Sequence, residues 1–291
     1  MSDSYFLNGF RNTVNRSVLT PPKVHEPPKI PHTPPNFNGK GKLAIALAGL
    51  SLLAASSVLS AKQYRESQID KAQQTFQETF MRDDISKEET IEMLERYKEI
   101  KKIPDKEEYL KAMFNEAKRN FGFENADIDL YLNEGKIHGN YQILGNTNSL
   151  CGFIEITKTQ TRDKAADSIH HEMRHMKQVY LGFNANPEQY VRNILISQLK
   201  SKGKDEEFIK RVMTPNYIKD NIEGIKQYMK IDNPSLNNIP EKDRPFALQL
   251  LNEGKNYISS EADHEGYMNT LEERDAYNIG QKMGKLIKDL R

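Results

Sequence analysis

Residues 168–178 read SIHHEMRHMKQ, and the H-E-x-x-H string at 171–175 within them organises the interpretation of the chain. Two histidines four positions apart project from the same face of a helix, one turn from each other. Both imidazoles can therefore reach a single cation at about 2.1 Å. Glu172 is offset from this row and can lie beside a metal-bound water and take its proton. His171 and His175 are thus candidate metal ligands, and Glu172 is the candidate general base.

The residues around the string have the periodicity of a helix with two different faces. The apolar side chains that recur on one face are Ala166, Ile169, Met173, Met176 and Tyr180. The two candidate ligands and Gln178 fall on roughly the opposite face. We expect a helix that is capped by Thr161 or Asp163, backs onto the core and presents its histidines to a cleft. His170 points about 100° away from His171, so we expect it to be structural or exposed.

Composition excludes some classes of protein. The 291 residues are 37% hydrophobic and 29% charged, which is enough for a packed core. Lys and Arg number 42 against 41 Asp and Glu, so no charge excess favours nucleic acid as a partner. The single cysteine, Cys151, excludes an intrachain disulfide.

The first 61 residues have a different composition from the rest. Residues 21–35 read PPKVHEPPKIPHTPP, and their seven prolines predict a disordered tail over 1–42, a spacer or a ligand for a proline-recognising partner. Residues 43–61, LAIALAGLSLLAASSVLSA, form an uncharged run of nineteen. At 1.5 Å per residue this run would reach about 28 Å, close to the hydrocarbon thickness of a bilayer.

We therefore expect residues 43–61 to form a single transmembrane helix in contact with the lipid bilayer. Basic residues outnumber acidic ones before the run, which favours a cytoplasmic N-terminus and an extracytoplasmic C-terminal part. A buried Ala/Leu core helix and a late, cleavable signal peptide are the alternatives. The apolar run begins later in the chain than an ordinary signal sequence does.

The remaining chain predicts an α+β fold that is mainly helical. Residues 62–124 read as a helical juxtamembrane region, with helix starts at Ser86 and Asp105. Residues 125–291 read as one domain. Three short strands are expected within it, in a small, mostly antiparallel sheet, at 127–132, 136–144 and 150–157, with Gly-Asn turns at 139–140 and 145–146. After residue 161 the pattern is helical, broken at Pro187, Pro215, Pro234 and Pro240.

The segment LCGFIEIT at 150–157, followed by ADSIHHEMRHMKQ at 166–178, resembles the zincin metallopeptidases. The string H-E-x-R-H-x-x-Q is also similar to bacterial metallopeptidases whose helix reads H-E-L-R-H with a Gln three residues on. The resemblance covers about residues 127–281. It implies a zinc cofactor, a protein or peptide substrate, and a strand above the active-site helix that lines the cleft. The strand near Cys151–Ile156 would then hold the substrate by strand addition.

A catalytic zinc needs a third protein ligand. The metzincin continuation would place a histidine at 181, but that residue is Leu181. The gluzincin pattern E-x-x-A matches Glu273-Arg274-Asp275-Ala276, which makes Glu273 the expected ligand and lets the helices approach closely at the alanine. Glu272 is the alternative, because helical periodicity puts it nearer the centre of the buried face. Tyr277 stands where many gluzincins have an acid, and Asp275 would partly replace that acid.

Other residues are weaker candidates. Cys151 could be a soft metal ligand, but we expect a buried structural cysteine. His264, Asp263 or Tyr267, shortly before the glutamate helix, could stabilise an oxyanion. His138 is expected to be an ordinary strand residue.

The sequence therefore predicts a membrane-anchored zinc metallopeptidase that hydrolyses peptide bonds with a zinc-activated water and Glu172 as general base. The alternative is a non-catalytic, membrane-anchored interaction protein that keeps a zincin fold and recruits partners through its proline-rich tail.

A retained membrane anchor and a cleaved signal peptide, two of the interpretations of residues 43–61, give different mature N-termini. A retained anchor predicts that the membrane-bound chain keeps the sequence before residue 43, because no cleavage follows insertion. N-terminal sequencing of the chain extracted from membranes measures this. A mature chain that begins near residue 61 or 62 would show instead that the run is a signal peptide.

Overall fold

The computed structural model describes residues 62–134, 137–138, 141–142, 145–254 and 264–290. The proline-rich tail and the apolar run at 43–61 lie outside these residues. Among the helices that are described, none combines the length and apolar character needed to cross a bilayer. Residues 72–291 belong to one compact unit, to which the following description applies.

The first helices begin where the sequence predicts them. Residues 62–80 are helical, and α2 (Lys87–Lys102) and α3 (Lys106–Asn120) follow. The Ser86 hydroxyl accepts a hydrogen bond from the Glu89 amide at 3.1 Å, and the Asp105 carboxylate accepts one from Glu108 at 2.8 Å. These bonds satisfy amides that have no partner within the helix, which fixes both helix starts.

The strands differ from the expectation in number and direction. The strands are β1 (Asp129–Asn133), β2 (Ile137–His138), β3 (Tyr141–Gln142), β4 (Gly145–Asn148) and β5 (Phe153–Thr157). One sheet has the order β1-β5-β4, in which β5 is parallel to β1 and antiparallel to β4. Two of the three described pairings are antiparallel, as expected, but the longest one, β1 with β5, is parallel. Alternation of side chains does not encode strand direction.

The predicted turn at 145–146 is also wrong, because these residues begin β4, where Gly145 pairs with Ile156 and Asn146 with Glu155. Pairing with β5 overrides the local turn preference of the Gly-Asn sequence. The expected single strand at 136–144 is instead β2 and β3, which pair antiparallel with each other. The turn expected at 139–140 lies outside the described residues.

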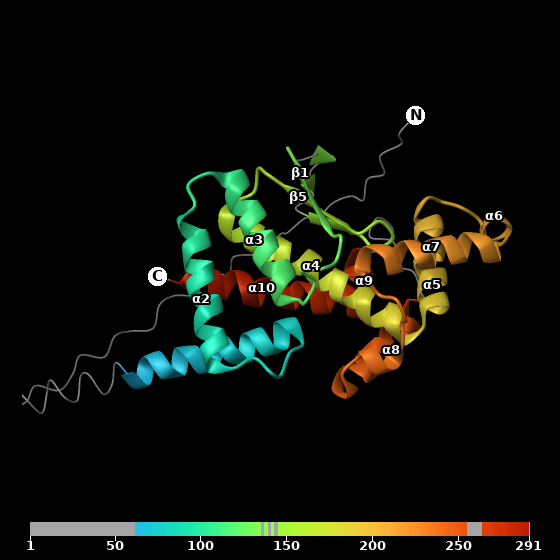
Figure 1. Ribbon diagram of the computed structural model, residues 1–291. Coiled ribbons are helices and arrows are strands. Elements are labelled where there is room, and N and C mark those ends of the chain that lie inside the picture. The colour runs from blue at the N-terminus through green and yellow to red at the C-terminus, as the bar shows by residue number, and fades with distance from the viewer. Residues whose placement is uncertain (1–61, 135–136, 139–140, 143–144, 255–263, 291) are drawn as a thin grey trace, which may run out of the picture. The chain divides into compact units, whose positions relative to one another are not determined.

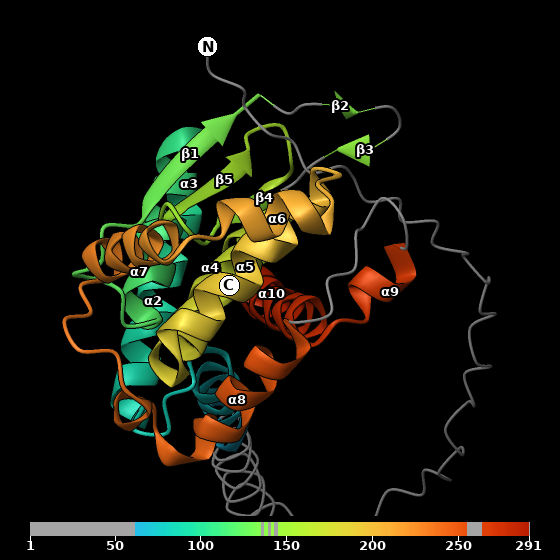
Figure 2. The same ribbon diagram turned by 90° about the vertical axis from the view of Figure 1, so that its right-hand side faces the viewer.

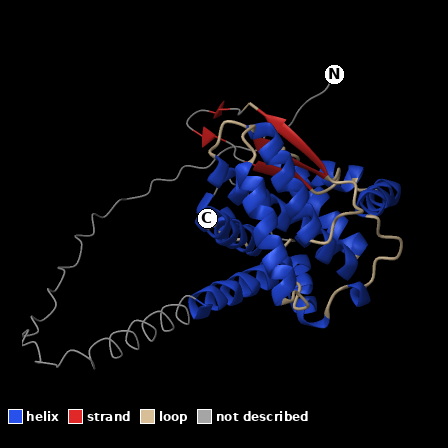
Figure 3. Ribbon diagram, turned by 60° about the vertical axis from the view of Figure 1, so that its left-hand side comes forward, coloured by secondary structure: helices blue, strands red, loops and turns tan. Residues whose placement is uncertain are grey.

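The helix that carries the H-E-x-x-H string, α4 (Arg162–Ala185), lies at the centre of the helical part of the fold (Figure 1 and Figure 2). It contacts α3, β4 and β5 and several later helices, so helices and sheet enclose it. Figure 3 shows the strands together at one side of the helices. The Thr161 hydroxyl accepts from the Lys164 amide, which decides the cap in favour of Thr161. The later elements are α5 (Pro187–Ser201), α6 (Glu206–Val212), α7 (Pro215–Met229), η1 (Leu236–Asn238), η2 (Glu241–Asp243), α8 (Arg244–Glu253), α9 (His264–Met268) and α10 (Leu271–Asp289).

The larger of the two buried hydrophobic clusters among the described residues connects the early helices to the sheet and to α4. It joins Phe76 and Phe80 with Tyr97 of α2, Ile154 of β5 and Met173 of α4, all of them buried. Burial of such side chains contributes about 1.5–3 kcal/mol each. Residues 72–124, which the sequence assigns to a juxtamembrane region, therefore contribute to the same core as the domain expected over 125–291.

His170 is buried in this core and has a structural role, which is one of the two alternatives expected from the sequence. Its Nδ1 lies 2.8 Å from the Ala166 carbonyl oxygen, and its Nε2 lies 3.0 Å from the Tyr97 hydroxyl. Asn120 donates to the same hydroxyl at 3.0 Å. With its proton on Nδ1, His170 donates to the Ala166 carbonyl and accepts from the Tyr97 hydroxyl through Nε2, so both ring nitrogens have a partner. Burial lowers the pKa of His170 to about 4, so it is neutral near pH 7.

The packing of α10 against α4 is unusually close and depends on small residues. Ala276, Gly280 and Gly284 face α4 and are all buried. A Cβ added at Gly280 would lie 2.8 Å from the Asp167 carbonyl oxygen and 3.1 Å from the Cβ of His171. One added at Gly284 would lie 1.3 Å from Oδ1 of Asp167. The two backbones can therefore approach only because these positions lack side chains.

This packing predicts opposite effects for two glycine-to-alanine changes. Gly280→Ala should lower the free energy of unfolding by about 1–3 kcal/mol, because the methyl group meets backbone that must move. Gly224→Ala in α7, where an added Cβ meets nothing within 4 Å, should be neutral or raise it by up to about 1 kcal/mol. Denaturant titration of the full chain measures both. Equal effects at the two positions would contradict the close packing.

Candidate metal centre

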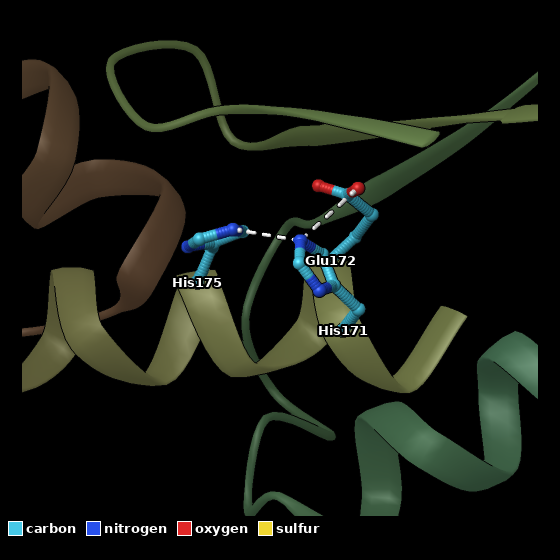
Figure 4. Close-up of side chains that lie close together, drawn as sticks. All are labelled: His171, Glu172 and His175. Carbon is cyan, nitrogen blue, oxygen red and sulfur yellow. Dashed lines mark hydrogen bonds and ion pairs between the residues drawn. The ribbon is translucent and has the colours of Figure 1, made fainter. Parts of the chain in front are cut away.

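The ligand atoms of the H-E-x-x-H string converge on one side of α4 (Figure 4). His171, Glu172 and His175 each offer a ligand atom, and these atoms lie within 4.8 Å of one another. The Nε2 atoms of the two histidines are 3.1 Å apart. Oε1 of Glu172 lies 3.9 Å from Nε2 of His171. These residues could hold a metal ion, and a helical turn places them as the spacing predicts.

Helix α10 brings Glu273 to the same point. Its Oε2 lies 3.6 Å from Nε2 of His171, and its Oε1 lies 3.5 Å from Nε2 of His175. In a tetrahedral site with bonds of 2.0–2.1 Å, ligand atoms are about 3.3–3.4 Å apart. Two imidazoles and one carboxylate are a donor set that could hold a metal ion, and the observed separations are close to these tetrahedral values.

The structure separates Glu273 from the alternative, Glu272. The side chain of Glu273 is 9% exposed, and the residue belongs to the buried face of α10, whereas Glu272 is only partly buried. The periodicity argument for Glu272 is thus wrong. It left out Gly280 and Gly284, which belong to the buried face of α10 and shift the centre of that face toward Glu273.

The histidines are more buried than the sequence suggests, with side chains of His171 and His175 that are 18% and 17% exposed. Burial, reinforced by the charge of His175, lowers the pKa of His171 to about 4. Burial also opposes charge on His175, but the Glu273 carboxylate outweighs this and raises its pKa. The same attraction, against desolvation, holds the pKa of Glu273 below its ordinary value. Without metal, His175 and Glu273 therefore form an ion pair beside a neutral His171.

Glu172 is held by β4, a contact that the sequence did not suggest. The Thr147 hydroxyl lies 2.8 Å from Oε2 of Glu172 and 3.0 Å from its carbonyl oxygen. Burial raises the pKa of Glu172 to about 7, and the Thr147 hydrogen bond opposes that rise. A carboxylate with this pKa is suited to accept and return a proton near neutral pH. The only sequence signal for this contact of Thr147 was the expected strand next to the helix.

Tyr267 of α9 also reaches the cluster, where its hydroxyl donates a hydrogen bond to Oε1 of Glu273. Of its two companions in the sequence prediction, Asp263 and the side chain of His264 lie outside the described residues. The same holds for the side chain of His138. Cys151 is exposed, so the expectation of a buried structural cysteine is wrong, and it is absent from the group of ligand atoms found among the described residues.

Comparisons with protein-family models, with curated proteins and with solved structures found no match to this chain. The zincin resemblance therefore stays a prediction from the sequence motifs.

The geometry predicts which substitutions remove metal. The wild type should bind about one zinc ion per chain, and His175→Ala and Glu273→Gln should each weaken binding by more than about 100-fold, because each removes a ligand. Glu272→Gln is the matched control on the same helix and should retain the metal. Metal content and competition with a chelator measure this for the full chain in detergent. A larger effect of Glu272→Gln than of Glu273→Gln would overturn the assignment.

Proposed function

We propose that this chain is a zinc-dependent metallopeptidase of the gluzincin type, with His171, His175 and Glu273 as the metal ligands. The observation that carries the proposal is the convergence of three residues beside a buried glutamate: the two histidine Nε2 atoms are 3.1 Å apart, and the two carboxylate oxygens of Glu273 lie 3.5 Å from the one and 3.6 Å from the other. A bound zinc ion would supply Lewis acidity, lowering the pKa of a water and polarising a carbonyl group. Proton transfer and substrate binding would be carried out by residues of the chain.

Glu172 is the general base in this proposal. Its Oε2 accepts a hydrogen bond from Thr147, which holds the carboxyl group in place. The other oxygen, Oε1, lies 3.9 Å from Nε2 of His171 and is therefore the atom nearer the ligands. Oε1 would take a proton from the attacking water and later return it to the leaving amine. Such proton transfer typically contributes a factor of about 10²–10⁴.

An extended peptide would bind along β4 rather than along β5. The expected use of the strand near Cys151–Ile156 is wrong, because β5 is paired on one side with β1 and on the other with β4. Within the described part of the sheet, β4 is an edge strand. A peptide that adds to this edge gains backbone hydrogen bonds without a sequence requirement. Thr147 then places its peptide bonds next to Glu172.

Tyr267 is the donor that we assign to the substrate carbonyl oxygen. Its hydroxyl donates to the carboxylate of Glu273 in the metal-free site and would turn to the substrate carbonyl once that carboxylate holds the metal. Burial raises its pKa well above the ordinary value, so the hydroxyl keeps its proton. A neutral donor in a buried site stabilises developing negative charge at little reorganisation cost.

The anchor, the location and the partners are also proposals. Residues 43–61 would hold the chain in the bilayer with the catalytic domain outside the cytoplasm, and the proline-rich tail over 1–42 would act as a spacer or recruit a partner. The rival function is a non-catalytic, membrane-anchored interaction protein of the same fold. The enzyme is favoured by the position of Glu172, a buried carboxyl group whose Oε1 lies 3.9 Å from Nε2 of His171 and which is not needed as a ligand in the proposed set.

The proposal predicts a separation of binding from activity at Glu172. Glu172→Gln should retain about one zinc per chain and reduce peptide cleavage by about 10²-fold or more, because the amide cannot accept the proton. Cleavage of a mixed peptide library, read by mass spectrometry, measures the activity. Glu265→Gln, an exposed glutamate of α9, is the control and should cleave like the wild type.

The rival predicts a different pattern for the same set of proteins. It expects zinc in the wild type and loss of zinc in His171→Ala, but no cleavage by any form. That result with the full chain would reject the enzyme and leave the metal centre in place.

A further inference from the structure

The side chain of Gln178, one turn after His175, lies between the two helices that carry the ligands. Its Oε1 is 2.9 Å from Nδ1 of His175. Its Nε2 is 2.9 Å from Oδ2 of Asp275 and 3.0 Å from the carbonyl oxygen of Glu272, both on α10. The residue is buried, at 4% exposure, so water does not substitute for these partners cheaply.

These contacts determine how the amide is oriented. The carboxylate of Asp275 and the carbonyl of Glu272 can only accept hydrogen bonds, so the group that faces them must be the NH₂ of Gln178. The amide oxygen then faces His175. A carbonyl oxygen cannot donate, so Nδ1 of His175 must carry the proton. The nitrogen that remains for a metal is Nε2, the atom that points at His171 and Glu273.

Arg174 holds the carboxyl group of Asp275 in the position that orients the amide. The Arg174 Nε and Nη2 atoms donate to the two oxygens of Asp275 at 2.7 and 3.0 Å. Nη1 of Arg174 donates to the carbonyl of Thr79 at 3.0 Å, so the guanidinium is itself fixed. Bidentate pairs of this kind are strong and directional.

Resting on the proposed metal centre, we propose that Gln178, oriented by Asp275, is a positioning residue that sets the proton of His175 on Nδ1 and so directs Nε2 to the metal. Mutation of a residue that hydrogen-bonds to a metal ligand typically lowers metal affinity about 10–100-fold. The alternative is that Gln178 only bridges α4 and α10 and affects stability alone.

The test measures zinc affinity of the full chain in detergent and, separately, its metal-free stability. Gln178→Met keeps the shape of the side chain but removes the amide, and should weaken zinc binding about 10–100-fold. Asp275→Asn should weaken it as well, because its amide no longer fixes the direction of Gln178. Gln189→Met, which removes an amide that bonds the Leu251 carbonyl, is the control and should bind zinc like the wild type.

A rescue and a spectrum distinguish positioning from bridging. Gln178→Glu combined with Asp275→Asn restores an acceptor for His175 without adding a negative charge, and should recover most of the affinity. In the zinc-loaded wild type, NMR should show a slowly exchanging Nδ1 proton on His175. Gln178→Met should lose this protection.

The outcomes separate this inference from the proposed function. If the wild type binds no zinc, the metal centre itself is refuted. If the wild type binds zinc and Gln178→Met binds it equally tightly with an unchanged Nδ1 signal, the metal centre stands and the positioning role is refuted. Should Gln178→Met fail to fold, the same comparison with Asp275→Asn decides.

Discussion

The close approach of α10 to α4 is the constraint on which the candidate site depends. The H-E-x-x-H string supplies two nitrogens from one helix, but a third donor must come from elsewhere in the chain. Gly280 lies so near α4 that an added Cβ would be 3.1 Å from the Cβ of His171. That proximity places Glu273, two helical turns earlier on α10, within 3.6 Å of the ligand nitrogens. The site is therefore a product of backbone packing and not of the motif alone.

Charge in this site is balanced by the chain itself. Buried ionisable groups are costly unless they are paired and hydrogen-bonded. Glu273 lies against His175, and Asp275 lies against Arg174. The pairs are separated by the neutral amide of Gln178, which bonds to a member of each. This arrangement explains how two carboxylates and a guanidinium can share one buried helix interface.

The sequence predicted the elements that local chemistry controls. The caps at Ser86, Asp105 and Thr161 and the helix around residues 171–175 follow from side chains close in the chain. Strand direction and the order β1-β5-β4 depend on distant pairing, which alternation does not encode. Glu273 lies beside the histidines as the E-x-x-A resemblance implied, although periodicity favoured Glu272. Thr147 could not have been found, because its role arises only where β4 packs on α4.

Arg174, inside the H-E-x-x-H string, makes the string depend on contacts with distant parts of the chain. This guanidinium joins three separate stretches of chain: α4, Asp275 of α10 and the carbonyl of Thr79 near the end of the helix over 62–80. Anyone grafting this constellation onto another scaffold would have to transplant all three stretches together. If α4 were transferred alone, Arg174 would lack the carboxylate of Asp275 that pairs with it. The contacts of Arg174 alone thus require three segments of chain, two of which a search built on the five-residue string would not include.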